Sequence, residues 1–301
     1  MKPYCHICSA SSDFLLNKDG FDLFKCPQCE LVFVHPQPTP EALSKELYSY
    51  ESGYQSNRAV QDLSRDPEQK RVSLPFEYFE KVRPHGKILD VGCGNGQMLY
   101  WAKQRGFSGA GVEVNKRTAD WAAQNGFTVY NGFLENAPYE KHSFDLEFLG
   151  EIIEHVNEPR KFIRDAASFL RPGGYVAITT PNIDCPWSRT TFKMHAWFGI
   201  PWSSVTPPYH LFQFNPKNLD RLMQEEGFTL EKEWFLHIPP LRYELGMLHV
   251  LKRYKKSRKF SDLLFMGFTY AVYVLLYAFF RTVHPFMKKD FQMVKIYKKK
   301  D

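Results

Sequence analysis

The stretch that decides the fold is KILDVGCGNG, residues 87–96, where a short apolar run passes directly into a glycine-rich turn. Residues 87–91 predict a buried strand, and residues 97–105 predict the helix after the turn. Glycine accepts positive φ angles and lets a ligand approach the backbone closely. The segment therefore predicts a strand–turn–helix unit with a ligand site at Gly92, Gly94 and Gly96.

Strands and helices alternate outward from this unit. Short apolar runs predict further strands at residues 109–114, 127–130, 144–149 and 175–180. Helices are expected at residues 116–124 and 159–170. Repeated units of this length imply an α/β fold, with a parallel sheet and helices on both faces. Residues 291–297 alternate in polarity and predict one more strand.

An acidic residue ends the second predicted strand. Glu113 follows Asp90 by 23 residues, and a carboxylate there can accept hydrogen bonds from both ribose hydroxyls of a nucleoside. NAD is one candidate ligand, but its fingerprint spaces the glycines G-x-G-x-x-G to seat a pyrophosphate. Here the spacing is G-x-G-x-G, and Asp90 would repel phosphate while tolerating an amino-acid ammonium group. A purely structural turn is the other alternative.

Four motifs resemble the class I S-adenosylmethionine-dependent methyltransferases: ILDVGCGNG (88–96), GVE (111–113), FDL with EIIEHV (144–156) and LRPGG (170–174). The resemblance covers roughly residues 80–240. It implies a Rossmann-like α/β fold with a seven-stranded sheet whose last strand is antiparallel. It also implies S-adenosyl-L-methionine as cofactor, bound by Asp90, Gly92, Gly94, Gly96 and Glu113.

One motif departs from the family pattern. Many members bind the adenine amino group through an Asp after the third strand, whereas this chain has NGFLE at residues 131–135. We therefore expect adenine to stack on Phe133 and to meet main-chain groups at Phe133 and Leu134.

The acceptor side of the expected fold offers several titratable groups. Methyl transfer is an in-line displacement that needs orientation and often a base. In this family, groups near the fourth strand and its following loop face the acceptor, and here they are Glu151, Glu154, His155 and His210. His155 is the favoured base because imidazole can be neutral at pH 7, although a purely structural hydrogen bond is an alternative role.

The amino-terminal cysteines predict a metal site. Cys5-x2-Cys8 and Cys26-x2-Cys29 can place four thiolates around one Zn²⁺ ion, as a zinc ribbon with a hairpin at residues 14–24. Two disulfides are the alternative. The first 25 residues lack an apolar run, so we expect no signal peptide and a reducing cytosol, which favours zinc. A bacterial methyltransferase subgroup resembles the chain in this ribbon, in PQPTP (36–40) and in PYHLFQF (208–214).

These patterns divide the chain into four parts. They are a zinc ribbon (1–38), a helical linker (39–75), the methyltransferase domain (76–240), and a basic and apolar extension with the final strand (241–301). Residues 181–214 are rich in proline and aromatic residues without clear periodicity. They predict either a lid over the acceptor or plain core packing.

The extension is strongly basic. Residues 252–301 carry 13 Lys or Arg and 3 Asp, a net +10 against +6 for the whole chain, so the first 251 residues carry a net −4. That body does not favour nucleic acid as a partner. Residues 263–280 are uncharged between basic flanks, and Tyr270, Tyr273 and Tyr277 form one stripe, which we expect to be the polar line of an amphipathic helix.

Three environments suit this apolar helix: a membrane span, a packed or dimerising interface, and the plane of an anionic membrane surface. If residues 291–297 join a cytosolic sheet, a single span is impossible. We therefore expect a cytoplasmic protein that is peripheral at the inner face of the membrane.

Together the patterns predict an enzyme that methylates an oxygen of a small or lipid-linked acceptor, in glycan or isoprenoid-quinone metabolism. The EHV of the fourth strand resembles ubiquinone-pathway O-methyltransferases. An RNA or protein methyltransferase that uses the ribbon for recognition, and a non-catalytic cofactor-binding membrane scaffold, are the alternatives. The oligomeric state stays open.

Overall fold

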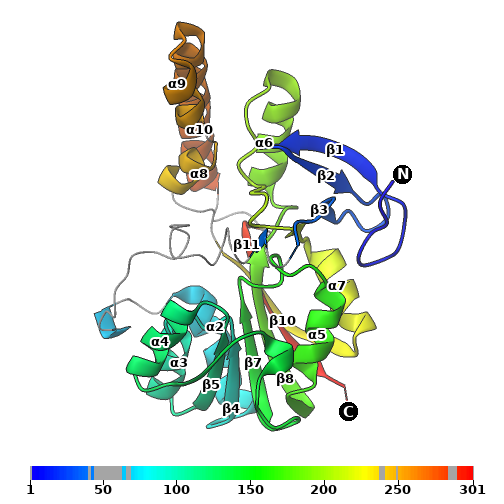
Figure 1. The fold of residues 1–301 in the computed structure, drawn as a ribbon, viewed down its shortest axis with the longest axis vertical. Coiled ribbons are helices and arrows are strands. Elements are labelled where there is room, and N and C mark those ends of the chain that lie inside the picture. Colours follow the sequence, from blue (N-terminus) through cyan, green and yellow to red (C-terminus); the bar gives the residue numbers. More distant parts are fainter. Residues whose placement is uncertain are drawn as a thin grey trace.

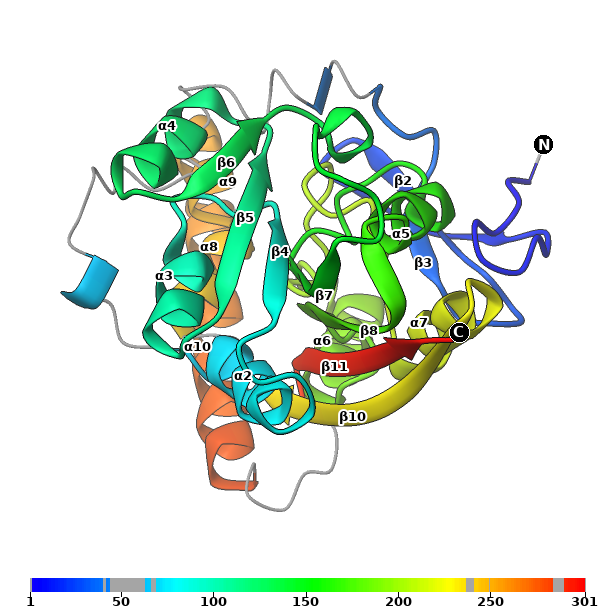
Figure 2. The same cartoon turned by 90° about the horizontal axis from the view of Figure 1, so that it is seen from below.

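A seven-stranded β-sheet forms the centre of the fold (Figures 1 and 2). The computed structural model describes residues 2–39, 42–43, 63–65, 69–236, 241–248, 250–283 and 290–300. Across the sheet the strands follow the order β10-β11-β8-β7-β4-β5-β6. Their bounds are β4 (Lys87–Val91), β5 (Ser108–Glu113), β6 (Thr128–Asn131), β7 (Phe144–Gly150), β8 (Leu170–Pro181), β10 (Phe228–Leu236) and β11 (Gln292–Lys299).

The strand directions match the sheet that the sequence predicts. Strands β6, β5, β4, β7 and β8 pair in parallel, and β11 is antiparallel to both β8 and β10. Both faces of β4 are buried, because Ile88 and Leu89 point to opposite sides of the sheet and each is fully covered. The expected strand at residues 291–297 is confirmed as β11.

Helices cover both faces of this sheet (Figure 2). One face carries α2 (Lys70–Val82), α3 (Gln97–Gln104) and α4 (Lys116–Gln124), and the other carries α5 (Pro159–Ala167) and α7 (Pro216–Glu225). Asn115 caps α4 by accepting two backbone N–H groups, and Asn215 and Asn218 form a capping box on α7. These local signals explain where α4 and α7 begin, and α4 begins at the predicted residue.

Apart from shifts of one or two residues, three boundaries differ from the sequence prediction. Helix α2 contains Pro75 inside it, so the boundary expected at residues 75 and 76 falls within one helix. Strand β8 begins at Leu170 rather than Tyr175, because Leu170 already pairs with Phe144. The predicted helix at residues 159–170 consequently ends at Ala167. Most of the expected linker lies outside the described residues.

The amino-terminal segment folds as a separate small sheet. Strands β1 (Asp13–Lys18), β2 (Phe21–Lys25) and β3 (Val32–Val34) are consecutive and antiparallel, which confirms the predicted hairpin. The fourth strand of this sheet is β9 (Phe212–Gln213), which pairs with β3 from far along the chain. The two sheets share one hydrophobic cluster, since Leu31 and Phe33 pack with side chains of α5 and α7.

Four helices lie beyond the carboxyl end of the central sheet: α6 (Pro186–Phe198), α8 (Leu241–Met247), α9 (Val250–Ser257) and α10 (Phe260–Val283). In Figure 1, α6, α9 and α10 rise from the same end of the molecule. Helix α6 lies within residues 181–214, where the sequence showed no periodicity. The ring of Trp187 is fully buried against Tyr273 and Phe280 of α10, so tertiary packing rather than a regular apolar pattern defines this helix.

Candidate functional site

A cavity of about 540 Å³ opens at the carboxyl ends of β4, β5 and β7. Ligand sites of doubly wound sheets lie at this edge, because the strand-to-helix turns converge there. The wall contains Val91, Gly92 and Gly94 after β4, Val112, Glu113 and Val114 at β5, Gly132, Phe133, Leu134 and Glu135 after β6, and Gly150, Glu151, Ile152 and His155 after β7.

In the glycine-rich turn, Gly94 and Gly96 are required for different reasons. Gly94 has φ +54° and faces open space, so it can present its backbone to a ligand. Gly96 has φ +85°, and a Cβ there would lie 2.6 Å from the ring of Phe127. Gly96 does not line the cavity and instead lets the start of α3 pack closely. Of the three predicted glycines, Gly92 and Gly94 are in the cavity wall.

The carboxylate of Glu113 is fixed in the cavity wall. Its Oε2 accepts the backbone N–H of Gly94 at 2.8 Å, and its Oε1 accepts that of Asn115 at 2.7 Å. Burial raises the pKa of this carboxyl, against the effect of the hydrogen bonds. Asp90 precedes Val91 of the cavity wall but does not itself line the cavity, and its side chain is buried. Burial, and to a lesser degree the charge of Glu113, raises the pKa of Asp90 well above the usual range.

The two residues expected at adenine both line the cavity. Leu134 is buried, whereas the ring of Phe133 is half exposed and available for stacking. Asn131 holds this segment against β5, because its Nδ2 donates to the carbonyl oxygen of Glu113 at 2.8 Å. The ends of β5 and β6 are therefore tied together beside Phe133.

Of the four acceptor-side candidates, Glu151 and His155 line the cavity, and Glu154 and His210 do not. Glu151 has φ +55°, a left-handed conformation that is rare for a residue with a side chain. Its Oε1 accepts hydrogen bonds from Thr179 Oγ1 at 3.1 Å and from Gln292 Nε2 at 2.8 Å. These contacts hold the Glu151 side chain in place at the end of β7.

The imidazole of His155 is oriented by a backbone carbonyl. Its Nδ1 lies 2.5 Å from the carbonyl oxygen of Tyr209, which can only accept, so Nδ1 carries the proton and Nε2 carries the lone pair. Burial lowers the pKa of His155, which keeps the ring neutral at pH 7. The ring of His210 stands edge-on at a centroid distance of 4.9 Å, and burial lowers its pKa well below the usual value.

Glu154 contacts the loop that follows His210 and does not line the cavity. Its backbone carbonyl accepts from Leu211 N at 2.8 Å and from Phe212 N at 3.1 Å, and its Oε2 accepts from Thr180 Oγ1 at 3.0 Å. Burial, followed by the charge of Glu151, raises the pKa of Glu154 well above the usual range. The backbone carbonyl of Glu154 thus fixes the loop that follows His210.

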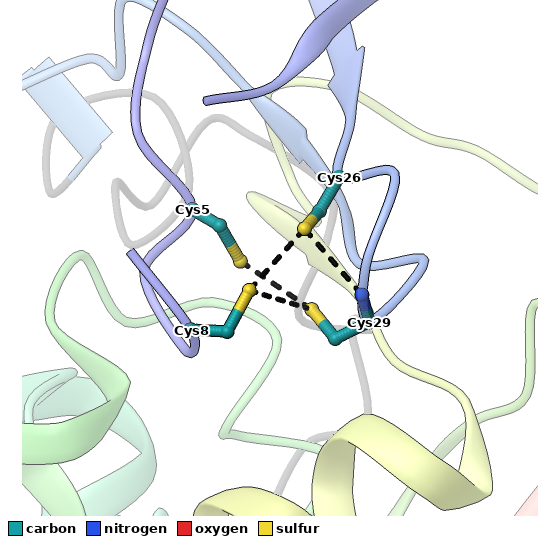
Figure 3. Close-up of side chains that lie close together, drawn as sticks. All are labelled: Cys5, Cys8, Cys26 and Cys29. Atoms are coloured by element: carbon teal, nitrogen blue, oxygen red, sulfur yellow. Dashed lines mark hydrogen bonds between the residues drawn. The ribbon is translucent and has the colours of Figure 1, made fainter. Parts of the chain in front are cut away.

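The four predicted cysteines converge at the base of the amino-terminal sheet (Figure 3). The sulfur of Cys5 lies 3.4 Å from that of Cys29, and the sulfur of Cys8 lies 3.3 Å from that of Cys26 and 3.7 Å from that of Cys29. All four are free thiols, so the disulfide alternative is wrong for this structure. Backbone N–H groups of Ile7 and Cys29 point at the sulfurs of Cys5 and Cys26.

Comparison with known proteins decides the family. A family model described as a methyltransferase domain matches residues 61–233. The chain belongs to this family. With the strand order of its sheet, this identifies a class I S-adenosylmethionine-dependent methyltransferase domain.

Curated relatives of this methyltransferase include two ubiquinone biosynthesis O-methyltransferases. That of Parvibaculum lavamentivorans is 35% identical over 132 residues, covering 42% of this chain and 47% of the relative. That of Bartonella tribocorum is 30% identical over 189 residues, covering 60% and 71%. The chain spans about half the length of the first curated relatives that it matches.

The likeness to a solved structure shows the fold alone. A protein from Pyrococcus horikoshii aligns with a TM-score of 0.51 at 13% identity, covering 84% of this chain and 100% of that one. The sequence prediction of fold class is therefore confirmed.

Sequence reasoning missed several cavity residues of the methyltransferase. Lys161, Phe162 and Asp165 of α5 line the cavity, and Gln292 contacts Glu151 from the last strand. The amphipathic pattern of α5 could have indicated which of its residues face the sheet. No local signal could have brought Gln292 to the site. Of the two alternatives for residues 181–214, the structure favours core packing over a lid, because no residue of this segment lines the cavity and Trp187 and Trp202 are core residues.

Proposed function

We propose that this methyltransferase transfers a methyl group from S-adenosyl-L-methionine to a hydroxyl of a small or lipid-linked acceptor in an isoprenoid-quinone or glycan pathway. The observation that carries the proposal is that Glu113 and His155 line one cavity. There the carboxylate of Glu113 could accept hydrogen bonds from the ribose, and the neutral imidazole of His155 could act as the base. The names of the curated relatives support an oxygen as the methylated atom.

The cofactor would lie across the glycine turn. The carboxylate of Glu113 would accept both ribose hydroxyls, because its two oxygens keep lone pairs beyond their backbone hydrogen bonds. The ring of Phe133 would stack on adenine, and Gly94 would allow close approach of the backbone. When bound, S-adenosyl-L-methionine supplies a methyl group that its sulfonium already activates.

His155 would serve as the base. A neutral imidazole with its lone pair at Nε2 can take the proton of the acceptor hydroxyl as the oxygen attacks. Glu151 would then stabilise the imidazolium through its negative charge at the same cavity wall. Glu154 and His210 would position His155 rather than react, since both lie behind it.

The four cysteines fit a structural zinc ion. Four sulfurs bonded tetrahedrally to zinc at 2.3 Å lie about 3.8 Å apart, and the sulfur separations of 3.3–3.7 Å are close to that spacing. The soft thiolate donor set and the two backbone N–H groups at the sulfurs also suit this ion. Cys5, Cys8, Cys26 and Cys29 would close the site completely, which leaves zinc a structural role.

The proposal extends to location and to domain organisation. The ribbon at residues 1–38 would serve the catalytic body, and the extension at residues 241–301 would attach the cytoplasmic enzyme peripherally to the inner face of a membrane. Helix α10 supports this, since its length and composition would allow it to cross a membrane. Its most apolar stretch of 18 residues has a mean hydropathy of 2.0, and only 17% of that stretch is buried inside the protein. Its neighbour β11 pairs in the central sheet, which argues against a single span.

The test is a methyl-transfer assay with methyl-labelled S-adenosyl-L-methionine. The purified protein is offered a dihydroxybenzoate, a free sugar and RNA in parallel, and each product is analysed by mass spectrometry for one added methyl group. We expect label on the phenol or on the sugar hydroxyl, and its loss in His155→Ala. Label on RNA, or binding of the cofactor without methylation of either the dihydroxybenzoate or the sugar, would overturn the proposed function.

A further inference from the structure

Helix α10 leaves one of its faces uncovered by the described residues. The exposed positions recur every three or four residues, which places them on one side of the helix. The large ones are exposed to between 45% and 71% and comprise Phe260, Leu264, Phe268, Val274, Leu275 and Phe279. Gly267, Ala271 and Ala278 lie between them. We call these residues the outer stripe, and it contains no charge.

The opposite side of α10 packs against the protein. Tyr273 is fully buried, and its hydroxyl donates to the carbonyl oxygen of Pro201 at 2.9 Å. Tyr277 and Phe280 contact the ring of Trp187. The tyrosine stripe that we expected to form the polar line of an amphipathic helix therefore faces inward, and the apolar outer stripe faces solvent. A soluble surface of this kind is a liability unless something covers it.

Basic residues stand at both ends of the outer stripe. Lys255, Lys256, Arg258 and Lys259 are exposed at the turn where α10 begins, and Arg281 is exposed near its last turn. Asp262, the acidic residue of the first turn, is buried. The stripe is thus an uncharged band between two cationic ends.

We infer that the outer stripe is a docking surface for an anionic lipid membrane, with α10 lying in the plane of the interface. This rests on the proposed membrane location and names the surface that makes the contact. From Phe260 to Phe279 the stripe is about 28 Å long, at 1.5 Å per residue. Apolar side chains would enter the acyl boundary, and the flanking cations would meet the lipid phosphates.

Charge decides between a membrane and a second copy of this chain. Parallel pairing of two α10 helices would bring the cluster around Lys259 onto itself, and antiparallel pairing would bring it onto Arg281. Both arrangements place like charges together, whereas an anionic surface neutralises both ends at once. A spanning hairpin is also disfavoured, because α9 packs along α10 and carries the exposed ammonium groups of Lys255 and Lys256.

Docking would bring the catalytic end of the enzyme to the lipid. Helices α9 and α10 rise from the end of the molecule at which the cavity opens, because β8 leads into α6 there and α6 packs against α10 (Figure 1). A lipid-linked acceptor could then reach the cavity without leaving the surface.

The experiment is flotation of the full chain with phosphatidylglycerol vesicles and with phosphatidylcholine vesicles. Wild type should float with the anionic vesicles. Combining Phe268→Ser, Leu275→Ser and Phe279→Ser should lower the ratio of bound to free protein at least about tenfold. Changing Lys255, Lys256, Arg258 and Lys259 together to Gln should lower it about tenfold at low salt and much less at high salt.

A matched control is available on α6. Trp197 and Phe198 are also exposed aromatic residues, but they lie outside the outer stripe, so Trp197→Ser with Phe198→Ser should leave flotation within about twofold of wild type. Equal loss in the control and the stripe variant would overturn the inference. So would a wild type that stays at the bottom of the gradient, or a stripe variant that turns a dimer into a monomer with unchanged flotation.

A titration with S-adenosyl-L-methionine on the same samples separates the two proposals. The stripe variant should bind the cofactor as wild type does, which also shows that it is folded. If wild type floats without binding the cofactor, the proposed function fails and the docking surface stands. If it binds the cofactor and does not float, the docking surface fails alone.

Discussion

Replacing Glu113 by alanine tests the cofactor site most directly. Two backbone N–H groups fix this carboxylate in the cavity wall, so its position before binding is the position it needs afterwards. A hydrogen bond to an ionised group contributes about 1.5–3 kcal/mol. Two ribose hydroxyls on one carboxylate then contribute about 3–6 kcal/mol, and their loss should raise the Kd for S-adenosyl-L-methionine about 10²- to 10⁴-fold.

The same substitution should change stability little. Alanine leaves the N–H groups of Gly94 and Asn115 without this acceptor, which costs about 1–3 kcal/mol for each group that stays buried. Against this, burial raises the pKa of Glu113, so the folded protein also bears a desolvation cost for the carboxylate that alanine removes. Since the two terms oppose each other, a large loss of binding should accompany a small shift in melting temperature.

Isothermal titration with S-adenosyl-L-methionine measures this effect, and circular dichroism of the same variants verifies the fold. Glu135→Gln is the matched control, because Glu135 also lines the cavity but is exposed, and its Kd should stay within about twofold of wild type. A folded Glu113→Ala protein that binds within about threefold of wild type would refute the reasoning. An equal loss in Glu135→Gln would show a general effect of charge instead.

Three further predictions concern the base, the buried aspartate and the cysteines. His155→Ala should lower kcat about 10²- to 10⁴-fold with little change in cofactor affinity, whereas kcat should be unchanged in His142→Ala, which removes a similar bond to a backbone carbonyl outside the cavity. Because burial lowers the pKa of His155, the acidic limb of the wild-type rate profile should lie below pH 6.5. Burial raises the pKa of Asp90, so between its unfolded and folded pKa values the folded state binds more protons than the unfolded state, and the free energy of unfolding should fall as pH rises through this range. Asp90→Asn should remove this slope and stabilise the cofactor-free protein at neutral pH by about 1 kcal/mol or more, as measured by urea titration. Cys26→Ser should release about one zinc ion per chain, as measured by metal analysis, and lower the melting temperature by about 5 °C or more; a metal-free wild type that is folded and active would contradict it.

The sequence predicted the central sheet and part of the cavity wall because both depend on local patterns. The run from Ile88 to Gly96 carries a strand period and a turn chemistry within nine residues, and Glu113 follows at the end of the next strand. The same logic could not place Gln292 against Glu151, since nothing local relates residues 141 positions apart. Nor could it indicate the left-handed backbone of Glu151, which only the surrounding contacts stabilise.

Helix α10 shows a different limit of sequence reasoning. A tyrosine stripe normally indicates the polar side of an apolar helix, yet here the hydroxyl of Tyr273 finds a buried carbonyl and the ring packs on Trp187. The pattern placed the three tyrosines on one side of the helix correctly, but it could not show whether that side faces the protein or the solvent. The direction depends on α6, a helix that has no clear periodicity of its own.

The amino-terminal sheet supports the loop that orients His155. Strand β9 joins β3, and the side chains of Asn215 and Asn218 donate to the carbonyl oxygen of Cys29, so β9 and the residues that follow it are held by the cysteine-bearing segment. Three residues before β9, the carbonyl of Tyr209 sets the tautomer of His155. Losing the order of the cysteine cluster should therefore disturb the proposed base before it disturbs the glycine turn, because Tyr209, which orients His155, lies just before β9. In Cys26→Ser we accordingly expect kcat to fall more than cofactor affinity, and the reverse result would separate the ribbon from catalysis.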